Sequence, residues 1–189
     1  MEATVTANGK TETFRGTGYH DHNWGNTGMY RLMHHWYWGR AKIGDYQAIT
    51  SYITGQEKYG YAHFPIFMLA KNGVLLCDDA PNCLTYSQSE PMMIAGKHLF
   101  KKLVYDYDDG QQHYRVTYRM QDILEQPGED RPAPGGVMKA ALKLMKLEPG
   151  YVRVTGTATL EKIKDSETVE TVDAPALWEL MYFGIDKDV

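Results

Sequence analysis

The fold class follows from one stretch of the sequence, Tyr151-Val152-Arg153-Val154-Thr155-Gly156-Thr157-Ala158-Thr159-Leu160-Glu161-Lys162. Small or apolar side chains form one face of this stretch: Val152, Val154, Gly156, Ala158 and Leu160. The residues between them are polar. This period of two is typical of an antiparallel strand with one face buried and the other in water. Tyr114–Gln121 alternates in the same way, so we expect a second strand of this kind there.

Short segments of similar character recur along the chain and are separated by turn residues. They are Phe14–Trp24, Tyr30–Ile43, Tyr46–Ile53, Tyr59–Lys71, Val74–Asp78, Leu84–Ser87, His98–Tyr107 and Pro175–Phe183. Asn72-Gly73 and Asp109-Gly110 consist of residues that tolerate a positive φ, so both predict type I′ hairpin turns. About nine or ten antiparallel strands predict an all-β barrel, because closure removes exposed edges and leaves room for one small ligand.

One segment, Val137–Glu148, has helical rather than strand periodicity. Its apolar residues recur every three or four positions, while Lys139, Lys143 and Lys146 lie on the opposite face. We therefore expect a single short amphipathic helix. Two roles stay open for it: it caps an open end of the barrel with its lysines in water, or it contacts a membrane surface and collects a lipophilic substrate.

Composition limits the classes of protein to which the chain can belong. Its 189 residues fit a single domain spanning 1–189, with 1–12 as a flexible lead-in, and 43% hydrophobic with 23% charged residues is typical of a globular protein. Lys and Arg number 20 against 24 Asp and Glu, and no basic run is present, which argues against a nucleic-acid partner. No apolar stretch approaches the roughly 18 residues that cross a bilayer. We expect a cytoplasmic protein without stable membrane insertion.

Tyr, Trp and Cys usage adds two further expectations. The chain has 14 Tyr and 4 Trp but only 5 Phe. Tyr and Trp combine an apolar body with a polar tip, so this excess suggests half-wet surfaces such as a cavity lining. Cys77 and Cys83 are too few for a disulfide scaffold, and we expect both as free thiols.

The segment Gly16–Gly25 holds the densest group of candidate functional residues. In an extended chain, His20, His22 and Trp24 point to one side, and Tyr19, Asp21 and Asn23 point to the other. Three interpretations remain open. His20 and His22 begin a metal site that needs a carboxylate and a third His, a His or Asp21 transfers a proton to an apolar substrate, or the group is a hydrogen-bonded polar plug at one barrel end.

A second cluster follows in His34-His35-Trp36-Tyr37-Trp38-Gly39-Arg40. As a strand, it sends His34, Trp36, Trp38 and Arg40 to one side and His35, Tyr37 and Gly39 to the other. Trp36 and Trp38 then form the wall of an apolar pocket, with Arg40 stacked on Trp38 or paired with a carboxylate. The equally open alternative is that these are large core residues.

Three motifs in order, Gly16–Gly25, His34–Ala41 and Ala176-Leu177-Trp178-Glu179-Leu180-Met181-Tyr182-Phe183-Gly184, carry a resemblance to a known family. The chain resembles the carboxy-terminal lipocalin-like domain of the kievitone hydratase family, which is related to carotenoid 1,2-hydratases and lipocalin-like Diels–Alderases. The resemblance covers about Thr13 to Gly184 and implies a lipocalin/calycin-like barrel.

The resemblance also implies an activity and a site. It implies a cofactor-free, metal-free hydratase or lyase that acts on an alkene of a lipophilic isoprenoid or prenylated small molecule. Asp21 with His20 or His22 is then the acid, and a larger set contacts substrate: Tyr19, Asn23, Trp24, His34, Trp36, Tyr37, Trp38, Arg40, Trp178 and Tyr182. A Diels–Alderase-type cyclase that folds a polyene, and a non-catalytic lipophilic-ligand carrier, are the alternatives.

The resemblance bears on partners as well. The relatives have two tandem barrels, and this chain resembles only the second. We therefore expect a second copy of the chain, in a homo-oligomer, or a separate lipocalin-like domain to stand where the relatives have their first barrel.

Overall fold

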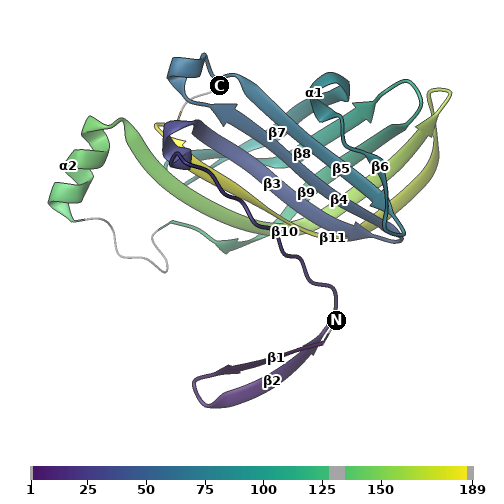
Figure 1. The fold of residues 1–189 in the computed structure, drawn as a ribbon, viewed down its shortest axis with the longest axis horizontal. Coiled ribbons are helices and arrows are strands. Elements are labelled where there is room, and N and C mark those ends of the chain that lie inside the picture. The colour runs from purple at the N-terminus through teal and green to yellow at the C-terminus, as the bar shows by residue number, and fades with distance from the viewer. Residues whose placement is uncertain (1, 128–134, 187–189) are drawn as a thin grey trace.

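A computed structural model describes residues 2–127 and 135–186, and most of them belong to one antiparallel sheet of nine strands (Figure 1). The strands are β3 (Met33–Ile43), β4 (Tyr46–Gly55), β5 (His63–Lys71), β6 (Val74–Cys77), β7 (Leu84–Ile94), β8 (Lys97–Asp108), β9 (His113–Glu125), β10 (Leu147–Lys164) and β11 (Glu167–Gly184). The predicted antiparallel, all-β class is confirmed.

The nine strands form two meanders that join at a single seam. The spatial order is β6-β5-β4-β3-β11-β10-β9-β8-β7, so β3 and β11 pair where the first meander meets the second. At this seam Gly39 lies opposite Trp178. A Cβ at Gly39 would lie 3.1 Å from the Tyr118 ring and 3.2 Å from Trp178 Cβ, so glycine permits the close approach of the strands.

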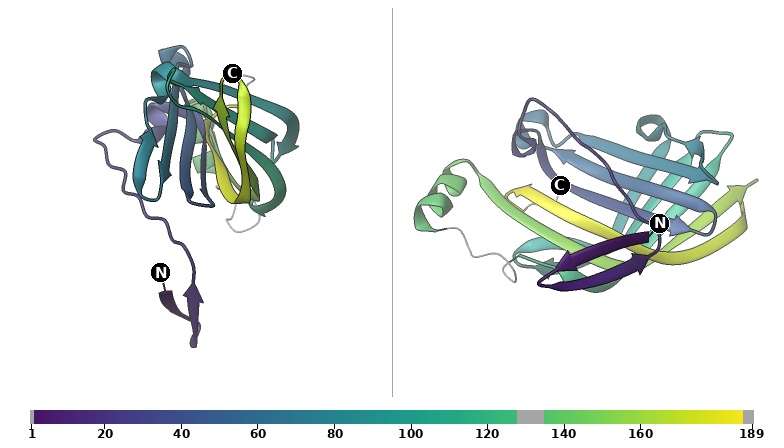
Figure 2. Two further views of the ribbon diagram at one scale, coloured as in Figure 1. Left: turned by 90° about the vertical axis from the view of Figure 1, so that its right-hand side faces the viewer. Right: turned by 60° about the horizontal axis from the view of Figure 1, so that its bottom comes forward.

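The sheet curves strongly but does not close into the predicted barrel (Figure 2). The end strands β6 and β7 each have one paired neighbour and share no strand pairing with each other. β6 has only four residues, and β7 contains Pro91, which has no N–H to donate. Short length and proline are both features of sheet edges, which explains why closure by hydrogen bonds stops here.

Aromatic side chains fill the concave face of the sheet. Tyr118 and Trp178 are fully buried with ring centroids 5.4 Å apart, and Tyr105 packs edge-on against Tyr118. The other buried aromatic residues of the core are Tyr37, Tyr46, Phe67, Tyr107, Tyr114 and Tyr182. The excess of Tyr that suggested a cavity lining therefore belongs largely to packed core.

Residues 2–28 differ most from the expected strands. β1 (Glu2–Ala7) and β2 (Lys10–Arg15) pair as an exposed hairpin that lies apart from the main sheet in Figure 1, where a lead-in was expected. The predicted strand Phe14–Trp24 is wrong, because β2 ends at Arg15 and residues 16–28 contain no strand. Asp, Asn and repeated Gly are poor strand formers, and no neighbouring strand compensates for them here.

The amphipathic helix exists but is shorter than predicted and does not cap the barrel. α2 covers Gly136–Leu144, and β10 already begins at Leu147. Val137 is 89% exposed and Leu144 is 88% exposed, and Figure 1 shows the helix projecting beyond the sheet. No helix in residues 2–127 or 135–186 is long and apolar enough to cross a bilayer.

The remaining connections include two 3-10 turns, η1 (Met29–Arg31) and η2 (Glu57–Tyr59), and the short helix α1 (Ala80–Cys83). Because η1 and η2 precede them, β3 begins at Met33 and not at the predicted Tyr30, and β5 begins at His63 and not at Tyr59. Cys77 and Cys83 are free thiols, as expected.

The two predicted hairpin turns differ in conformation. Asn72 and Gly73 both have positive φ, 50° and 80°, which confirms the type I′ prediction. In the second turn only Gly110 has a positive φ, and the Asp109 carboxylate instead accepts the N–H groups of Gln111 and Gln112. Side-chain capping of the loop has therefore replaced the type I′ geometry.

Candidate active site

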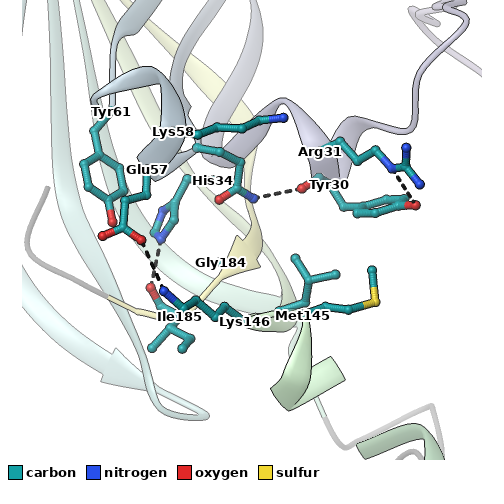
Figure 3. Close-up of a pocket in the computed structure, with 12 residues that line it drawn as sticks. Tyr30, Arg31, His34, Glu57, Lys58, Tyr61, Met145, Lys146, Gly184 and Ile185 are labelled. Atoms are coloured by element: carbon teal, nitrogen blue, oxygen red, sulfur yellow. Dashed lines mark hydrogen bonds and ion pairs between the residues drawn. The ribbon is translucent and has the colours of Figure 1, made fainter. Parts of the chain in front are cut away.

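An open cavity of about 470 Å³ lies at one end of the sheet, where η1, η2, the α2–β10 junction and the end of β11 meet (Figure 3). Its lining residues are Tyr30, Arg31, His34, Gln56, Glu57, Lys58, Tyr61, Met145, Lys146, Leu147, Gly184 and Ile185. They come from five parts of the chain. The volume is within the range that binds a small molecule.

Hydrogen bonds from Gln56 hold the upper wall of the cavity together. The Gln56 amide donates to the carbonyl oxygens of Tyr30 at 2.8 Å and Met33 at 2.9 Å, which ties η2 to η1. On the opposite side, Lys146 and Glu57 form an exposed ion pair with 3.8 Å between Nζ and Oε2 (Figure 3). The cavity therefore has a fixed wall and a charged, solvated rim.

His34 is the titratable group most firmly positioned in the cavity wall. Its residue is only 3% exposed, and its Nε2 lies 2.8 Å from the carbonyl oxygen of Ile185 (Figure 3). The Tyr61 ring lies edge-on to it with centroids 5.4 Å apart. A Cβ at Gly184 would overlap the imidazole, so this glycine makes room for the ring. His34 is thus held on three sides.

A register irregularity at the start of β3 brings His34 and His35 together. Consecutive strand residues normally point to opposite faces, but the pairing shifts between Met33 and His35, and both histidines are buried. Their Nδ1 atoms are 2.8 Å apart, and the His35 ring stacks on Tyr182 at 4.8 Å. Burial, with a smaller contribution from His34, lowers the pKa of His35 to about 3, so this ring is neutral near pH 7.

A second polar cluster lies beside the cavity. The buried Lys97 ammonium lies 3.0 Å from Glu148 and 3.3 Å from the carbonyl oxygen of Gly184. His98 Nδ1 lies at hydrogen-bond distance, 2.5 Å, from a carboxylate oxygen of Asp186. Burial opposes ionisation of Asp186, but hydrogen bonds from His98 and Tyr182 together more than offset it and hold the pKa of Asp186 below its usual value. These contacts fix the end of the chain that carries Ile185.

The predicted acid group lies in an exposed segment outside this cavity. His20, Asp21 and His22 are all exposed, as are Asn23 and Trp24. The Asp21 carboxylate accepts hydrogen bonds from Tyr19 at 3.2 Å and Asn23 at 3.3 Å. None of these residues lines the cavity. Within residues 2–127 and 135–186, no three His, Cys, Asp or Glu side chains lie close enough together to hold a metal ion.

Trp36, Trp38 and Arg40 point to the convex, outer face of β3. Tyr19 packs there, with its ring centroid 5.2 Å from that of Trp38 and 5.3 Å from the Arg40 guanidinium. Of the four side chains predicted to share one face, Trp36, Trp38 and Arg40 do so, whereas His34 is buried beside Tyr182 because of the register shift at the start of β3. The pocket that they were expected to wall lies elsewhere, because alternation identifies a face but not whether that face is concave.

The remaining predicted residues face the interior. Tyr37 is buried in the core, where its hydroxyl accepts the N–H of Phe100 at 3.0 Å, and burial raises its pKa. Trp178 belongs to the central core, whereas Tyr182 stacks on His35 next to the cavity. Of all the predicted site residues, His34 is the one that lines the cavity.

Sequence reasoning missed several residues that shape this site. Gln56 and Glu57 lie between the predicted strands Tyr46–Ile53 and Tyr59–Lys71, and Tyr61 lies in the second of them, so no motif marked these residues as part of a site. The adjacent pair His34-His35 was the one local signal of an irregular strand at this position.

Comparison with known proteins places the chain in a family. A sequence model described as Diels-Alderase-like matches residues 1–121, which is more than half of the chain. The chain belongs to the Diels-Alderase-like family. This agrees with the resemblance seen in the three sequence motifs.

The Diels-Alderase-like chain also matches a curated protein and two solved structures. It is 30% identical over 82 residues to the quinolone epoxide rearrangement protein asqO of Emericella nidulans, which covers 43% of this chain and 22% of that protein. The crystal structure of kievitone hydratase from Nectria haematococca matches with a TM-score of 0.57 and 16% identity over 96% of this chain and 49% of that chain. CghA with Sch210972 matches with a TM-score of 0.53 and 10% identity over 84% and 43%.

The two structural matches support the fold assignment alone, since their sequence identities are low. In each of the three comparisons the aligned region is less than half of the other protein. The activities of these longer proteins therefore enter only as a basis for proposals about this chain.

Proposed function

We propose that this chain is an enzyme that uses its own side chains for acid–base chemistry on a lipophilic natural product. The leading reaction is addition of water to, or removal of water from, an alkene of an isoprenoid or prenylated small molecule. The observation that carries the proposal is His34, a buried imidazole fixed in the wall of a cavity of about 470 Å³. Imidazole is the most common general acid and base near neutral pH.

The chemistry of hydration matches the groups around the cavity. In the addition direction, the substrate alkene replaces the Ile185 carbonyl as the acceptor of the His34 Nε2 proton. Water then adds to the cation at the other carbon, and the protonated adduct loses a proton to solvent. Met145, Leu147 and Ile185 provide apolar contacts for the substrate, and the Tyr61 ring offers a π face to positive charge.

A second candidate reaction is isomerisation or cyclisation at the same site. It is favoured by the family match and by the printed name of asqO, a quinolone epoxide rearrangement protein. In this case a proton from His34 activates an oxygen atom of the substrate, or a hydrogen bond polarises a carbonyl of a folded polyene. The product then has the same mass as the substrate.

Mass spectrometry separates these candidates. The purified chain is incubated with a prenylated phenol and, separately, with a conjugated polyene. A product heavier by one water supports hydration, and a new product of unchanged mass supports isomerisation. Binding without any product favours a carrier, and the absence of both binding and product overturns the proposal for these substrate classes.

Two variants test which residue is the acid. We expect His34→Gln to lose turnover while retaining the fold, since glutamine keeps a side-chain amide near Ile185 but cannot donate a proton as an acid. Asp21→Asn tests the assignment made from the sequence, which stays a prediction. Loss of turnover in Asp21→Asn with full activity in His34→Gln would move the acid to the exposed segment and refute our assignment.

A further inference from the structure

Three further side chains extend from His34 in a continuous line of hydrogen bonds. The His34 and His35 Nδ1 atoms are 2.8 Å apart, His35 Nε2 lies 3.3 Å from Thr54 Oγ1, and Thr54 Oγ1 lies 3.4 Å from His63 Nδ1. His34, His35 and Thr54 are buried, whereas His63 at the start of β5 is exposed. The line therefore runs from the cavity wall through the interior to solvent.

The carbonyl of Ile185 sets the direction of every hydrogen bond in this line. A carbonyl oxygen only accepts, so His34 Nε2 carries a proton and, in the neutral ring, His34 Nδ1 is an acceptor. His35 Nδ1 must then donate to His34, which leaves His35 Nε2 to accept from the Thr54 hydroxyl. Thr54 Oγ1 in turn accepts from Nδ1–H of His63. All four groups therefore point their protons along the line toward the Ile185 carbonyl in the cavity wall.

Burial keeps the middle of the line neutral. His35 has a pKa lowered to about 3, mainly by desolvation, so it passes a proton on more readily than it stores one. Two histidine rings of the line also have aromatic neighbours. Tyr182 stacks on His35, and Tyr52 stacks on His63 with ring centroids 4.9 Å apart. The rings are held in place by aromatic contacts on their faces and by hydrogen bonds at their edges.

We propose that His63, Thr54 and His35 form a proton relay that connects solvent to His34 in the cavity wall. The inference rests on the proposed acid–base role of His34 and adds a supply route for its proton. His35, Thr54 and His63 act through His34 and are positioning residues, not catalytic ones.

One passage through the relay conserves atoms and charge. His34 Nε2 gives its proton to the ligand, and His35 Nδ1–H passes a proton to His34 Nδ1. The Thr54 hydroxyl proton moves to His35 Nε2, His63 Nδ1–H replaces it, and water protonates His63 at Nε2. One proton enters from solvent, one leaves to the ligand, and each ring ends neutral in its other tautomer.

The same hydrogen bonds also satisfy buried polar atoms, so a purely structural role must be distinguished from a relay. A structural network exchanges its protons with water only when the protein opens locally. A relay exchanges them along the line of hydrogen bonds in the closed protein. The exchange rate of the His35 Nδ1 proton separates the two roles, and it is measured without any ligand.

NMR spectroscopy of the unliganded, ¹⁵N-labelled protein provides the test. We expect Nε2–H on His34 and Nδ1–H on His35 and His63. Thr54→Val keeps the side-chain volume but removes the hydroxyl, and we expect it to slow exchange of the His35 Nδ1 proton by about tenfold or more, the effect of roughly 1.4 kcal/mol on a barrier. Thr54→Ser should restore the wild-type rate.

Thr50→Val is the matched control. Thr50 lies on the same strand and is as fully buried as Thr54, but its hydroxyl donates to Tyr118 at 3.1 Å and has no part in the line. It should leave the exchange rate of the His35 proton unchanged. If Thr54→Val fails to fold, His63→Phe interrupts the solvent end instead while keeping an aromatic ring against Tyr52.

Two results would overturn the relay. One is an unchanged His35 exchange rate in folded Thr54→Val or His63→Phe, and the other is a wild-type protein with the opposite tautomers on His34 and His35. Neither result concerns turnover. A failed relay therefore leaves the proposed function standing, and an inactive protein with the expected exchange behaviour contradicts only the proposed function.

Discussion

At the scale of single residues, the site depends on the absence of a Cβ atom at Gly184. Its missing Cβ leaves the space that the His34 imidazole occupies. The glycine does not need a left-handed backbone, because its φ is not positive. Its role is therefore one of volume, and a small substitution tests it.

We expect Gly184→Ala to lower the free energy of unfolding by about 1–3 kcal/mol, the usual cost of overpacking, and to displace the His34 ring. Urea denaturation measures the first effect, and the His34 ring resonances report the second. Gly16→Ala is the control, because no atom lies within 4 Å of a Cβ placed there. Equal stabilities for the two variants would show that the wall around His34 yields easily.

The depressed pKa of His35 predicts how stability depends on pH. In the unfolded chain His35 takes up a proton below about pH 6.5, whereas in the folded protein it does so only near pH 3. Its contribution to stability is therefore complete above pH 6.5 and is lost progressively as the pH falls toward 3. Between pH 7 and pH 5 we expect a loss of about 2 kcal/mol from this group.

The variant His35→Gln should remove this part of the pH dependence. The free energy of unfolding is measured by urea denaturation at pH 7 and pH 5 for the wild type and the variant. His20→Gln, a substitution of an exposed histidine, should show the wild-type difference between the two pH values. If His35→Gln also keeps the full wild-type difference, His35 is protonated in the folded protein at pH 5.

At the scale of secondary-structure elements, the hairpin β1–β2 is separable from the sheet. All residues of both strands are exposed, and an isolated two-stranded hairpin is at best marginally stable in water. We expect a variant that begins at Gly16 to unfold at the same urea concentration as the full chain. A clearly lower midpoint would show that the hairpin packs against the sheet in solution.

α2 illustrates a limit of sequence reasoning at this scale. Its periodicity identified a helix with one apolar side, and the helix is present. Periodicity carries no information on whether that side has a partner. Val137 and Leu144 remain exposed, so the expected capping of the barrel does not occur, because the chain turns into β10 before the helix can fold back over the opening.

At the scale of the whole molecule, Trp178 joins the two meanders. It lies opposite Gly39 across the β3–β11 seam, packs on Tyr118 of β9, and is 1% exposed. We expect Trp178→Ala to cost about 3–5 kcal/mol of stability, because the cavity that it leaves touches both meanders. Urea denaturation followed by circular dichroism measures this change.

Trp24→Ala provides the comparison for Trp178→Ala. Trp24 is 87% exposed, so its removal should change the free energy of unfolding by no more than about 0.5 kcal/mol. A cost at Trp24 similar to that at Trp178 would mean that the segment 16–28 contributes to the core. Two separate transitions in Trp178→Ala would show that the meanders unfold independently.

The sequence by itself determined most of the strands, which of their side chains share a face, and the family. Period two placed Tyr37 and Gly39 on one face of β3 and Trp36, Trp38 and Arg40 on the other, because side-chain direction in a strand depends only on neighbouring residues. The Asn72-Gly73 turn followed from the same kind of local preference. Dense polar motifs such as Gly16–Gly25 marked the family but did not locate a cavity.

Only the tertiary structure decided where the site lies. It depends on a register irregularity at the start of β3 and on a hydrogen bond between His34 and Ile185, which are 151 residues apart in the sequence. Neither local preference nor alternation specifies which distant segments meet at the end of a curved sheet. That meeting depends on how the whole sheet bends and where it stops pairing, so the cavity could not be read from any one stretch of the chain.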